Sequence, residues 1–226
     1  MTRIQALAAA AALLLAPAGA AAAAPLSPPT GDASLEAPAP RASDVVVAIA
    51  AWAIRTNDPG GRPFAVVDKA AARVYVFGAD GKLKGEAPAL LGSAWGDRSE
   101  PYVGDRELST ILPHERTTPA GRFQTAWGKA PGGKRTLWVD YATAVSIHPL
   151  ASVLPGEKRE TRLASATPGD NRITFGCINV APAFFNAVVQ PNFRDSGVFY
   201  VLPEAQSLQS AFPGFQPPPG LALAAR

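Results

Sequence analysis

The sequence predicts a mainly β domain with a few short helices, and three observations support this prediction. After Pro63 the chain consists of short runs rich in Val, Ile, Phe and Tyr, separated by turn residues. Hydrophobic residues make up 47% of the 226 residues and charged residues only 17%, which is too little charge for a disordered chain. A single stretch within this β-rich part has apolar residues at helical spacing.

The first two dozen residues have the layout of a secretory signal peptide. Arg3 precedes an apolar run from Ala6 to Ala18, and small residues fill Gly19 to Ala24. The apolar run is short for a membrane-spanning helix, which needs about 20 residues, although an uncleaved anchor is the alternative. We expect residues 1–24 to be a cleaved signal peptide and the mature chain to have no membrane span.

Two segments separate this leader from the β-rich part. Residues 25–42 are rich in Pro and Ala, which is typical of an extended linker. Residues 43–61 are predicted to form a helix and a connection. Ser43 is a plausible N-cap, Val45–Arg55 is apolar and rich in Ala, and Asn57 begins a group of helix-ending residues.

Six runs in the following part have the composition of strands, and Asp80-Gly81 is a clear turn signal. The predicted strands are Phe64–Asp68, Arg73–Phe77, Arg122–Trp127, Leu137–Asp140, Ala144–His148 and Val198–Leu202.

One helix is predicted within the β-rich part, over about residues 181–189. Its apolar stripe, which we expect to pack on the core, consists of Phe184, Phe185, Val188 and Val189. Residues 204–226 are rich in Pro, Gln and Ser and include Pro217–Pro219, so they are predicted to form a poorly ordered C-terminal tail.

Charge and cysteine content exclude several classes of function. The net charge is +3, and removal of Arg3 with the leader lowers it to +2. So small a positive charge does not indicate a nucleic-acid-binding protein. A single Cys excludes an intramolecular disulfide. One Cys with two His makes a tetrahedral zinc site improbable, and we expect neither a metal nor another cofactor.

The segment from Asn171 to Asn179 contains the single cysteine, Cys177. Gly176 removes a side chain just before the sulfur, which lets a substrate carbonyl approach the backbone. Asn179 can cap the helix that follows, so we expect Cys177 to lie just before a helix N-terminus, where a thiolate and an oxyanion are both favoured. A buried structural thiol is the alternative, although an unpaired thiol in an exported protein needs a reason to persist.

A cysteine nucleophile needs a base, and His148 and His114 are the only imidazoles. His148 ends a predicted strand, whereas His114 lies in a polar, loop-like stretch. Sites are best built on rigid elements, which favours His148, although either residue can be a structural histidine.

At these residues the sequence resembles the L,D-transpeptidase catalytic domain family, also called YkuD-like, whose members remodel bacterial peptidoglycan. The resemblance covers about residues 62–203 and implies a β-sandwich-like fold with a few short helices. It is carried by Phe64–Lys84, similar to the family's first hairpin, by Thr118–Phe123, similar to its TPxGxF segment, and by Ile147-His148 and Thr174–Asn179, similar to its IH and [ST]HGC[IV][RN] motifs.

The resemblance implies that Cys177 is the nucleophile and His148 the general base. It also implies that the N–H groups of Gly176 and Cys177 form the oxyanion cradle, and Thr174 falls where the family has Ser or Thr. From their nearness in sequence, Ser146 and Arg172 are candidates for contacts that support the site.

Three departures from the family pattern concern the same site. Phe175 replaces the family's second His, and Pro149 replaces the usual Gly after the first His. The span between His148 and Cys177 is also longer than the family norm. This insertion includes Lys158–Arg162 and is interpreted as a solvated loop, with a substrate lid as the alternative.

The resemblance implies an exported L,D-transpeptidase that acts on peptidoglycan stem peptides and so serves cell-wall biosynthesis and cell shape, in the periplasm or at the cell wall. The acyl acceptor would be a stem-peptide amine or a wall-attached protein. Two alternatives stay open: a hydrolase of the same fold, which trims stems or releases wall-linked protein, and a non-catalytic wall-binding module.

Overall fold

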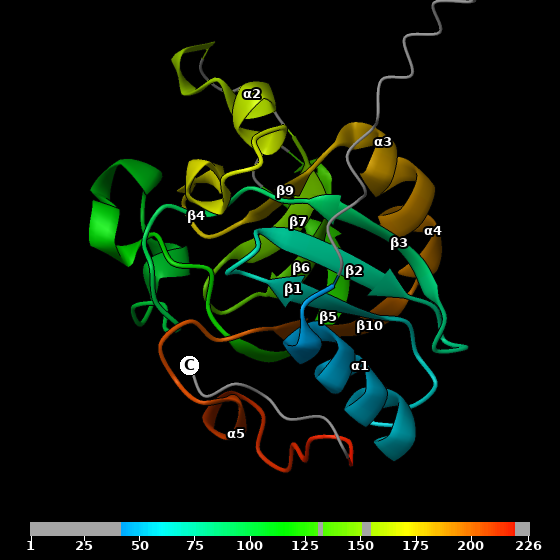
Figure 1. Cartoon of the computed structure of the whole chain (residues 1–226). Helices are drawn as coiled ribbons and strands as arrows, with labels where there is room; N and C mark the ends of the chain where they lie inside the picture. Colours follow the sequence, from blue (N-terminus) through cyan, green and yellow to red (C-terminus); the bar gives the residue numbers. More distant parts are fainter. Residues whose placement is uncertain (1–41, 131–132, 151–154, 220–226) are drawn as a thin grey trace, which may run out of the picture. The chain divides into compact units, whose positions relative to one another are not determined.

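The computed structural model describes residues 42–130, 133–150 and 155–219 (Figure 1). The predicted signal peptide, residues 1–24, and all but the last residue of the predicted linker lie outside these ranges. Within them, no helix combines the length and the apolar character needed to cross a membrane.

Eight strands form one large mixed sheet, with the order β3-β2-β1-β10-β5-β6-β7-β9 (Figure 1). Their bounds are Phe64–Asp68 (β1), Arg73–Phe77 (β2), Leu83–Pro88 (β3), Gly121–Lys129 (β5), Arg135–Asp140 (β6), Val145–Pro149 (β7), Ile178–Val180 (β9) and Ser196–Val201 (β10). A separate parallel pair joins Leu91–Gly92 (β4) and Arg172–Thr174 (β8).

The two edges of the large sheet approach each other. Leu90, two residues after β3, exchanges backbone hydrogen bonds of 2.8 and 2.9 Å with Asn179 in β9. This bridge makes the sheet nearly barrel-like. The domain is therefore mainly β, as predicted, and eight of its strands form one continuous sheet.

The central strands β1 and β10 pair in parallel and are buried on both faces. Side chains alternate along a strand. Val67 and Phe199 therefore enter one apolar cluster, and Val66 and Tyr200 enter another. Two-sided burial explains why these strands read as continuous apolar runs in the sequence.

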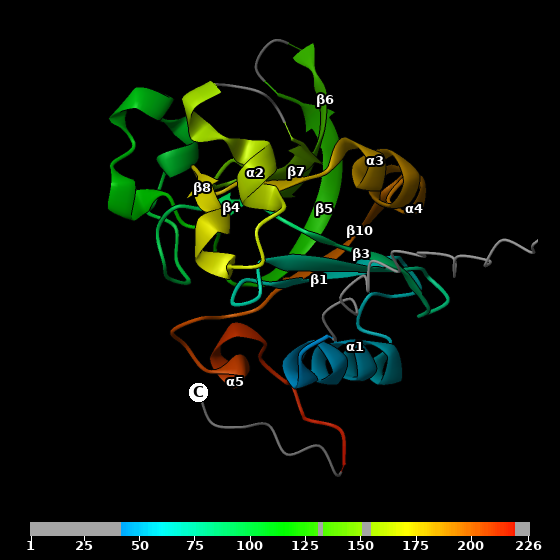
Figure 2. The same cartoon turned by 45° about the horizontal axis from the view of Figure 1, so that its top comes forward.

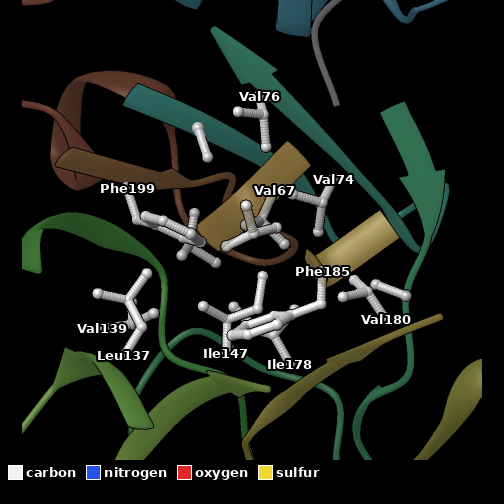
Figure 3. Close-up of a cluster of buried hydrophobic side chains, with 14 of the residues drawn as sticks. Val67, Val74, Val76, Leu137, Val139, Ile147, Ile178, Val180, Phe185 and Phe199 are labelled. Carbon is white, nitrogen blue, oxygen red and sulfur yellow. The ribbon is translucent and has the colours of Figure 1, made fainter. Parts of the chain in front are cut away.

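The inner core lies where the two halves of the curved sheet face each other (Figure 3). Val67, Val74 and Val76 from β1 and β2 face Ile147 and Ile178 from β7 and β9. The remaining labelled side chains of this core are Leu137, Val139, Val180, Phe185 and Phe199.

The outer core lies between the sheet and helix α1 (Asp44–Thr56), which begins at the predicted N-cap, Ser43. The segment after β10 covers the same side and includes α5 (Leu208–Ala211) (Figure 2). Phe212 and Phe215 are buried there, and Phe215 meets Trp52 of α1 edge-to-face.

This packing corrects the prediction of a separate, poorly ordered tail. Residues 204–219 belong to the folded domain, because buried side chains of this Pro-rich stretch join the outer core: Ala211, Phe212 and Phe215. Residues 220–226 lie outside the described residues.

The predicted helix after Cys177 is present. It consists of α3 (Pro182–Phe184), a π-helical turn (Phe185–Val189) and α4 (Gln190–Asn192). Its apolar stripe packs on the inner core, as expected.

The six predicted strands are all present, with bounds that differ by no more than two residues. Four strands were not predicted: β3, β4, β8 and β9. Strand β3 is an edge strand that carries Lys84, Gly85 and Glu86, a composition typical of protected edges. The other three have only two or three residues each, too few to show an alternating pattern.

The remaining elements are short. They are 3₁₀ turns at Val103–Asp105 (η1), Leu108–Thr110 (η2), Pro113–Glu115 (η3), Pro155–Glu157 (η5) and Pro168–Asn171 (η6), and one short helix, α2 (Arg159–Leu163).

Candidate active site

Parallel pairing of β7 and β9 brings the two halves of the site together. The register places Ile147 opposite Ile178, and both side chains are fully buried in the inner core. Because side chains alternate along strands, the residues flanking this pair project from the other face. On that face, Ser146 and His148 meet Cys177 and Asn179.

Two contacts follow from this register. The Ser146 hydroxyl oxygen lies 3.5 Å from the Cys177 sulfur. The Asn179 side-chain nitrogen lies 3.0 Å from Nε2 of His148, whose Nδ1 lies 2.9 Å from the Pro149 carbonyl oxygen. The Cys177 sulfur also lies 3.6 Å from the Ala144 carbonyl oxygen.

The His148 imidazole and the Cys177 thiol shift each other's pKa. Burial alone would raise the pKa of the Cys177 thiol, but the neighbouring imidazole and the Ser146 hydroxyl outweigh burial and lower it. Burial alone would lower the pKa of His148, but interaction with the Cys177 sulfur outweighs burial and raises it. Both shifts favour a thiolate beside an imidazolium.

Of the two imidazoles, His148 is the one whose interaction lowers the pKa of the Cys177 thiol. His114 is exposed on the 3₁₀ turn η3. Among the described residues, no group of three His, Cys, Asp or Glu side chains converges as metal ligands.

The backbone at Gly176 requires glycine. Its φ of +128° is disfavoured for other residues, and a Cβ atom there would lie 2.8 Å from the Thr117 carbonyl oxygen. The buried Thr118 hydroxyl donates to the Gly176 carbonyl at 2.8 Å and accepts from the Gly92 N–H at 2.9 Å. The Thr118 hydroxyl thereby links the turn before Cys177 to strand β4.

The expected helix N-terminus beside Cys177 is absent. Asn179 lies in strand β9, and the helix begins only at Pro182. The sequence expectation was wrong because three residues of strand separate the cysteine from the helix. The thiolate is therefore favoured by side chains, His148 and Ser146, and not by a helix dipole.

The oxyanion cradle also differs from the expectation. The Gly176 N–H donates to the Thr174 hydroxyl at 3.1 Å, and that hydroxyl donates to the Cys177 carbonyl at 2.7 Å. Thr174 therefore closes the turn, and the Gly176 N–H is already used. For the Cys177 N–H we find no acceptor among the described residues, which leaves it able to bind an oxyanion.

Phe175, at the position of the second His in the motif that this segment resembles, is half-buried and lies beneath the guanidinium group of Arg116, 4.0 Å from the ring centroid. Arg116 is held in turn by the Ile111 carbonyl. A cation–π pair therefore stands where the family has an imidazole.

Arg172 is not part of the site, contrary to the expectation from its nearness in sequence. It is buried, pairs with Glu204, donates to the Lys69 carbonyl and stacks on Trp95 at 4.2 Å. It begins strand β8, whose pairing with β4 directs it toward the β1–β2 turn at Lys69. Arg172 therefore supports the fold.

Sequence reasoning missed two residues that contact the site machinery. Asn179 was expected to cap a helix but is fully buried and contacts His148. Arg159 was placed in a solvated insertion but donates to the Asn179 side-chain oxygen at 2.7 Å. Asn179 is the last residue of the motif-like stretch Thr174–Asn179, whereas no sequence pattern distinguishes Arg159 from its charged neighbours.

The sequence was also compared with known proteins. No family model matches the chain, and no curated protein sequence matches it at a significant level.

Proposed function

We propose that the protein is an exported cysteine acyltransferase of the L,D-transpeptidase type, acting on peptidoglycan stem peptides. The observation that carries this proposal is the pairing of β7 with β9, which sets the Cys177 thiol beside the His148 imidazole with mutually shifted pKa values. The motif resemblance at Thr118–Phe123, Ile147-His148 and Thr174–Asn179 supplies the substrate class.

In the first half-reaction, Nε2 of His148 gives up its contact with the Asn179 amide and takes the proton of the Cys177 thiol. The sulfur attacks the carbonyl carbon of the amide between the third-position diamino acid and the terminal D-alanine. The Cys177 N–H donates to the resulting oxyanion. The carbon–nitrogen bond then breaks, the imidazolium protonates the leaving amine, and a thioester on Cys177 remains.

In the second half-reaction, an amine of a neighbouring stem or of a wall-attached protein attacks the thioester. His148 takes the proton of the attacking amine and returns one to the departing sulfur. The new amide bond cross-links the two chains, and Cys177 and His148 return to their initial states. Each step therefore balances without a metal or another cofactor.

The proposal extends to the fold and to the location. The near-barrel domain over about residues 62–203 is proposed to be the L,D-transpeptidase catalytic fold, with residues 204–219 added to it. The signal-peptide pattern in residues 1–24 supports a periplasmic or wall-associated location.

Phe175 favours a second candidate function, a hydrolase of the same fold. The family's imidazole is replaced here by a phenyl ring under a guanidinium group, two residues before Cys177 in the sequence. If water reaches the thioester before an amine does, the same site trims stems or releases wall-linked protein.

The test is an assay of the mature protein on purified muropeptides, with and without an added amine acceptor. We expect Cys177→Ala and His148→Ala to lose cross-linking, and His114→Ala, which removes the other imidazole, to retain it. Product formed only by hydrolysis would select the second candidate. Near-normal activity of Cys177→Ala would overturn both. If the wild type forms no product at all, a non-catalytic wall-binding module would be left.

A further inference from the structure

The inserted segment between β7 and β8 directs one of its charged side chains inward. Arg159, the first residue of α2, has a side chain only 11% exposed, and its Nε donates to the Glu157 carboxylate at 2.6 Å. One terminal nitrogen of the same guanidinium group donates to the Asn179 side-chain oxygen at 2.7 Å. Lys158 and Glu160 on either side are exposed.

The Arg159 contact fixes the orientation of the Asn179 amide. A guanidinium group has donors and no acceptor, so the atom that it contacts must be the amide oxygen. The amide NH₂ is then the group that faces Nε2 of His148 at 3.0 Å. Because an NH₂ group donates, Nε2 must be the unprotonated ring nitrogen, and Nδ1–H donates to the Pro149 carbonyl.

We infer that Arg159 is a positioning residue that acts through Asn179 to hold His148 as the neutral Nδ1–H tautomer, in which Nε2 carries the lone pair and accepts from the Asn179 amide. This inference rests on the proposed function, since it concerns the base of that reaction. At Arg159 the insertion is then neither a solvated loop nor a lid, but a support for His148.

The arrangement has a consequence for the protonated ring. An imidazolium carries a proton on Nε2, which cannot donate to an NH₂ group, so protonation breaks the Asn179 contact. Arg159 therefore opposes the imidazolium and keeps it acidic enough to protonate the leaving amine. Without Arg159 the amide can turn, and its oxygen can accept from Nε2–H.

Several charged or titratable groups act on the His148 ring. Cys177, just before β9, favours its protonated form, and Lys134, just before β6, disfavours it. From α2, Arg159 acts as one half of an ion pair with Glu157, which offsets much of its charge. Replacing Arg159 is therefore expected to change the pKa and tautomer of His148 mainly by freeing the Asn179 amide to turn.

The test is an NMR titration of the mature protein labelled with ¹⁵N-histidine, because the two nitrogens of each ring report both tautomer and pKa. With only two His in the chain, His114→Gln assigns the His148 signals. In Arg159→Met we expect the pKa of His148 to rise by about 0.5–1 unit and the neutral ring to show a mixture of tautomers. In the wild type we expect Nδ1–H alone.

Arg162→Met is the matched control. Arg162 lies on the same helix and carries the same charge, but it donates to the carbonyls of Glu157 and Asp170. We expect its replacement to leave the His148 tautomer unchanged and to move the pKa by less than about 0.2 unit. An unchanged tautomer in Arg159→Met, or the same shift in both variants, would overturn the inference.

A folding defect of the variant, or a failure of the proposed function, can each be told apart from a failure of this inference. If Arg159→Met does not fold, Arg159→Gln is titrated in its place. The glutamine side chain is too short to reach the Asn179 side-chain oxygen. Near-normal activity of Cys177→Ala would defeat the proposed function, yet the titration would still report whether Arg159 sets the His148 tautomer. The two failures are therefore distinguishable.

Discussion

A thiol is a good nucleophile near neutral pH only when its surroundings favour the thiolate, and at Cys177 the nearest groups decide this. The half-buried sulfur contacts the Ser146 hydroxyl, and the His148 imidazole lowers the thiol pKa. Ser146 itself is buried, so its hydroxyl interacts with the sulfur in surroundings that screen the interaction less than water does.

Ser146→Ala tests this contribution. The hydroxyl lowers the thiol pKa, so its removal should raise that pKa and move the midpoint of Cys177 alkylation to higher pH by about 0.5–1 unit. The measurement is the rate of iodoacetamide labelling as a function of pH. Ser165→Ala, whose hydroxyl contacts Asp170, is the control and should leave the midpoint in place. A midpoint shared by Ser146→Ala and the wild type would contradict the assigned role.

At the scale of elements, the site depends on one register and one turn. The parallel pairing of β7 with β9 sets which side chains face each other, and buried Ile147 and Ile178 fix it, because a slip by one residue would turn both out of the core. The turn before Cys177 is held by Thr118, which links it to Gly92 of β4.

Thr118→Val should therefore affect both stability and activity. Valine has a similar shape but no hydroxyl, so the buried Gly92 N–H and Gly176 carbonyl lose their partner, which costs about 2–4 kcal/mol of unfolding free energy. Urea denaturation measures this loss, and the muropeptide assay should show a lower rate. Thr125→Val removes a single bond of 3.2 Å far along the sheet and should cost about 1 kcal/mol. Equal effects of the two variants would argue against a special role for Thr118.

At the scale of the whole domain, two apolar clusters share the central strands. The inner core supports the strands that carry the site, and the outer core attaches α1 and the segment after β10 to the other face. Phe212, which is 2% exposed and meets Tyr200 edge-to-face at 6.0 Å, joins this segment to β10.

Phe212→Ala should destabilise the domain by about 3–4 kcal/mol, because it leaves a cavity beside Tyr200. Thermal or urea unfolding followed by tryptophan fluorescence provides the measurement. Leu108→Ala removes an apolar side chain that is 61% exposed and should change the unfolding free energy by less than about 0.5 kcal/mol. A stable Phe212→Ala protein would mean that residues 204–219 are only loosely attached.

Much of the fold could be predicted because its central elements carry strong local signals. The runs Phe64–Asp68 and Arg73–Phe77 match β1 and β2 residue for residue, and Ser43 caps α1 as expected. Strand β9 could not be predicted, since three residues show no alternation, and its omission produced the expectation of a helix directly after Cys177.

The candidate site divides in the same way. Cys177 and His148 were chosen from scarcity and motif order, and the His148 imidazole lowers the pKa of the Cys177 thiol. Arg172 was chosen from sequence proximity alone, but strand pairing carries it away from the sulfur. Gly176 is needed for its backbone conformation, while its N–H is occupied by Thr174, a detail that depends on the local turn.

The sequence by itself determined the mainly β class, the central strands and the two residues of greatest chemical interest, because composition, alternation and rarity are local properties. Only the tertiary structure decided the contacts of those residues: Ser146 with the thiol, and Asn179 and Arg159 with the imidazole. Such contacts join segments up to 31 residues apart, and their geometry arises from strand register and buried hydrogen bonds that no local pattern encodes.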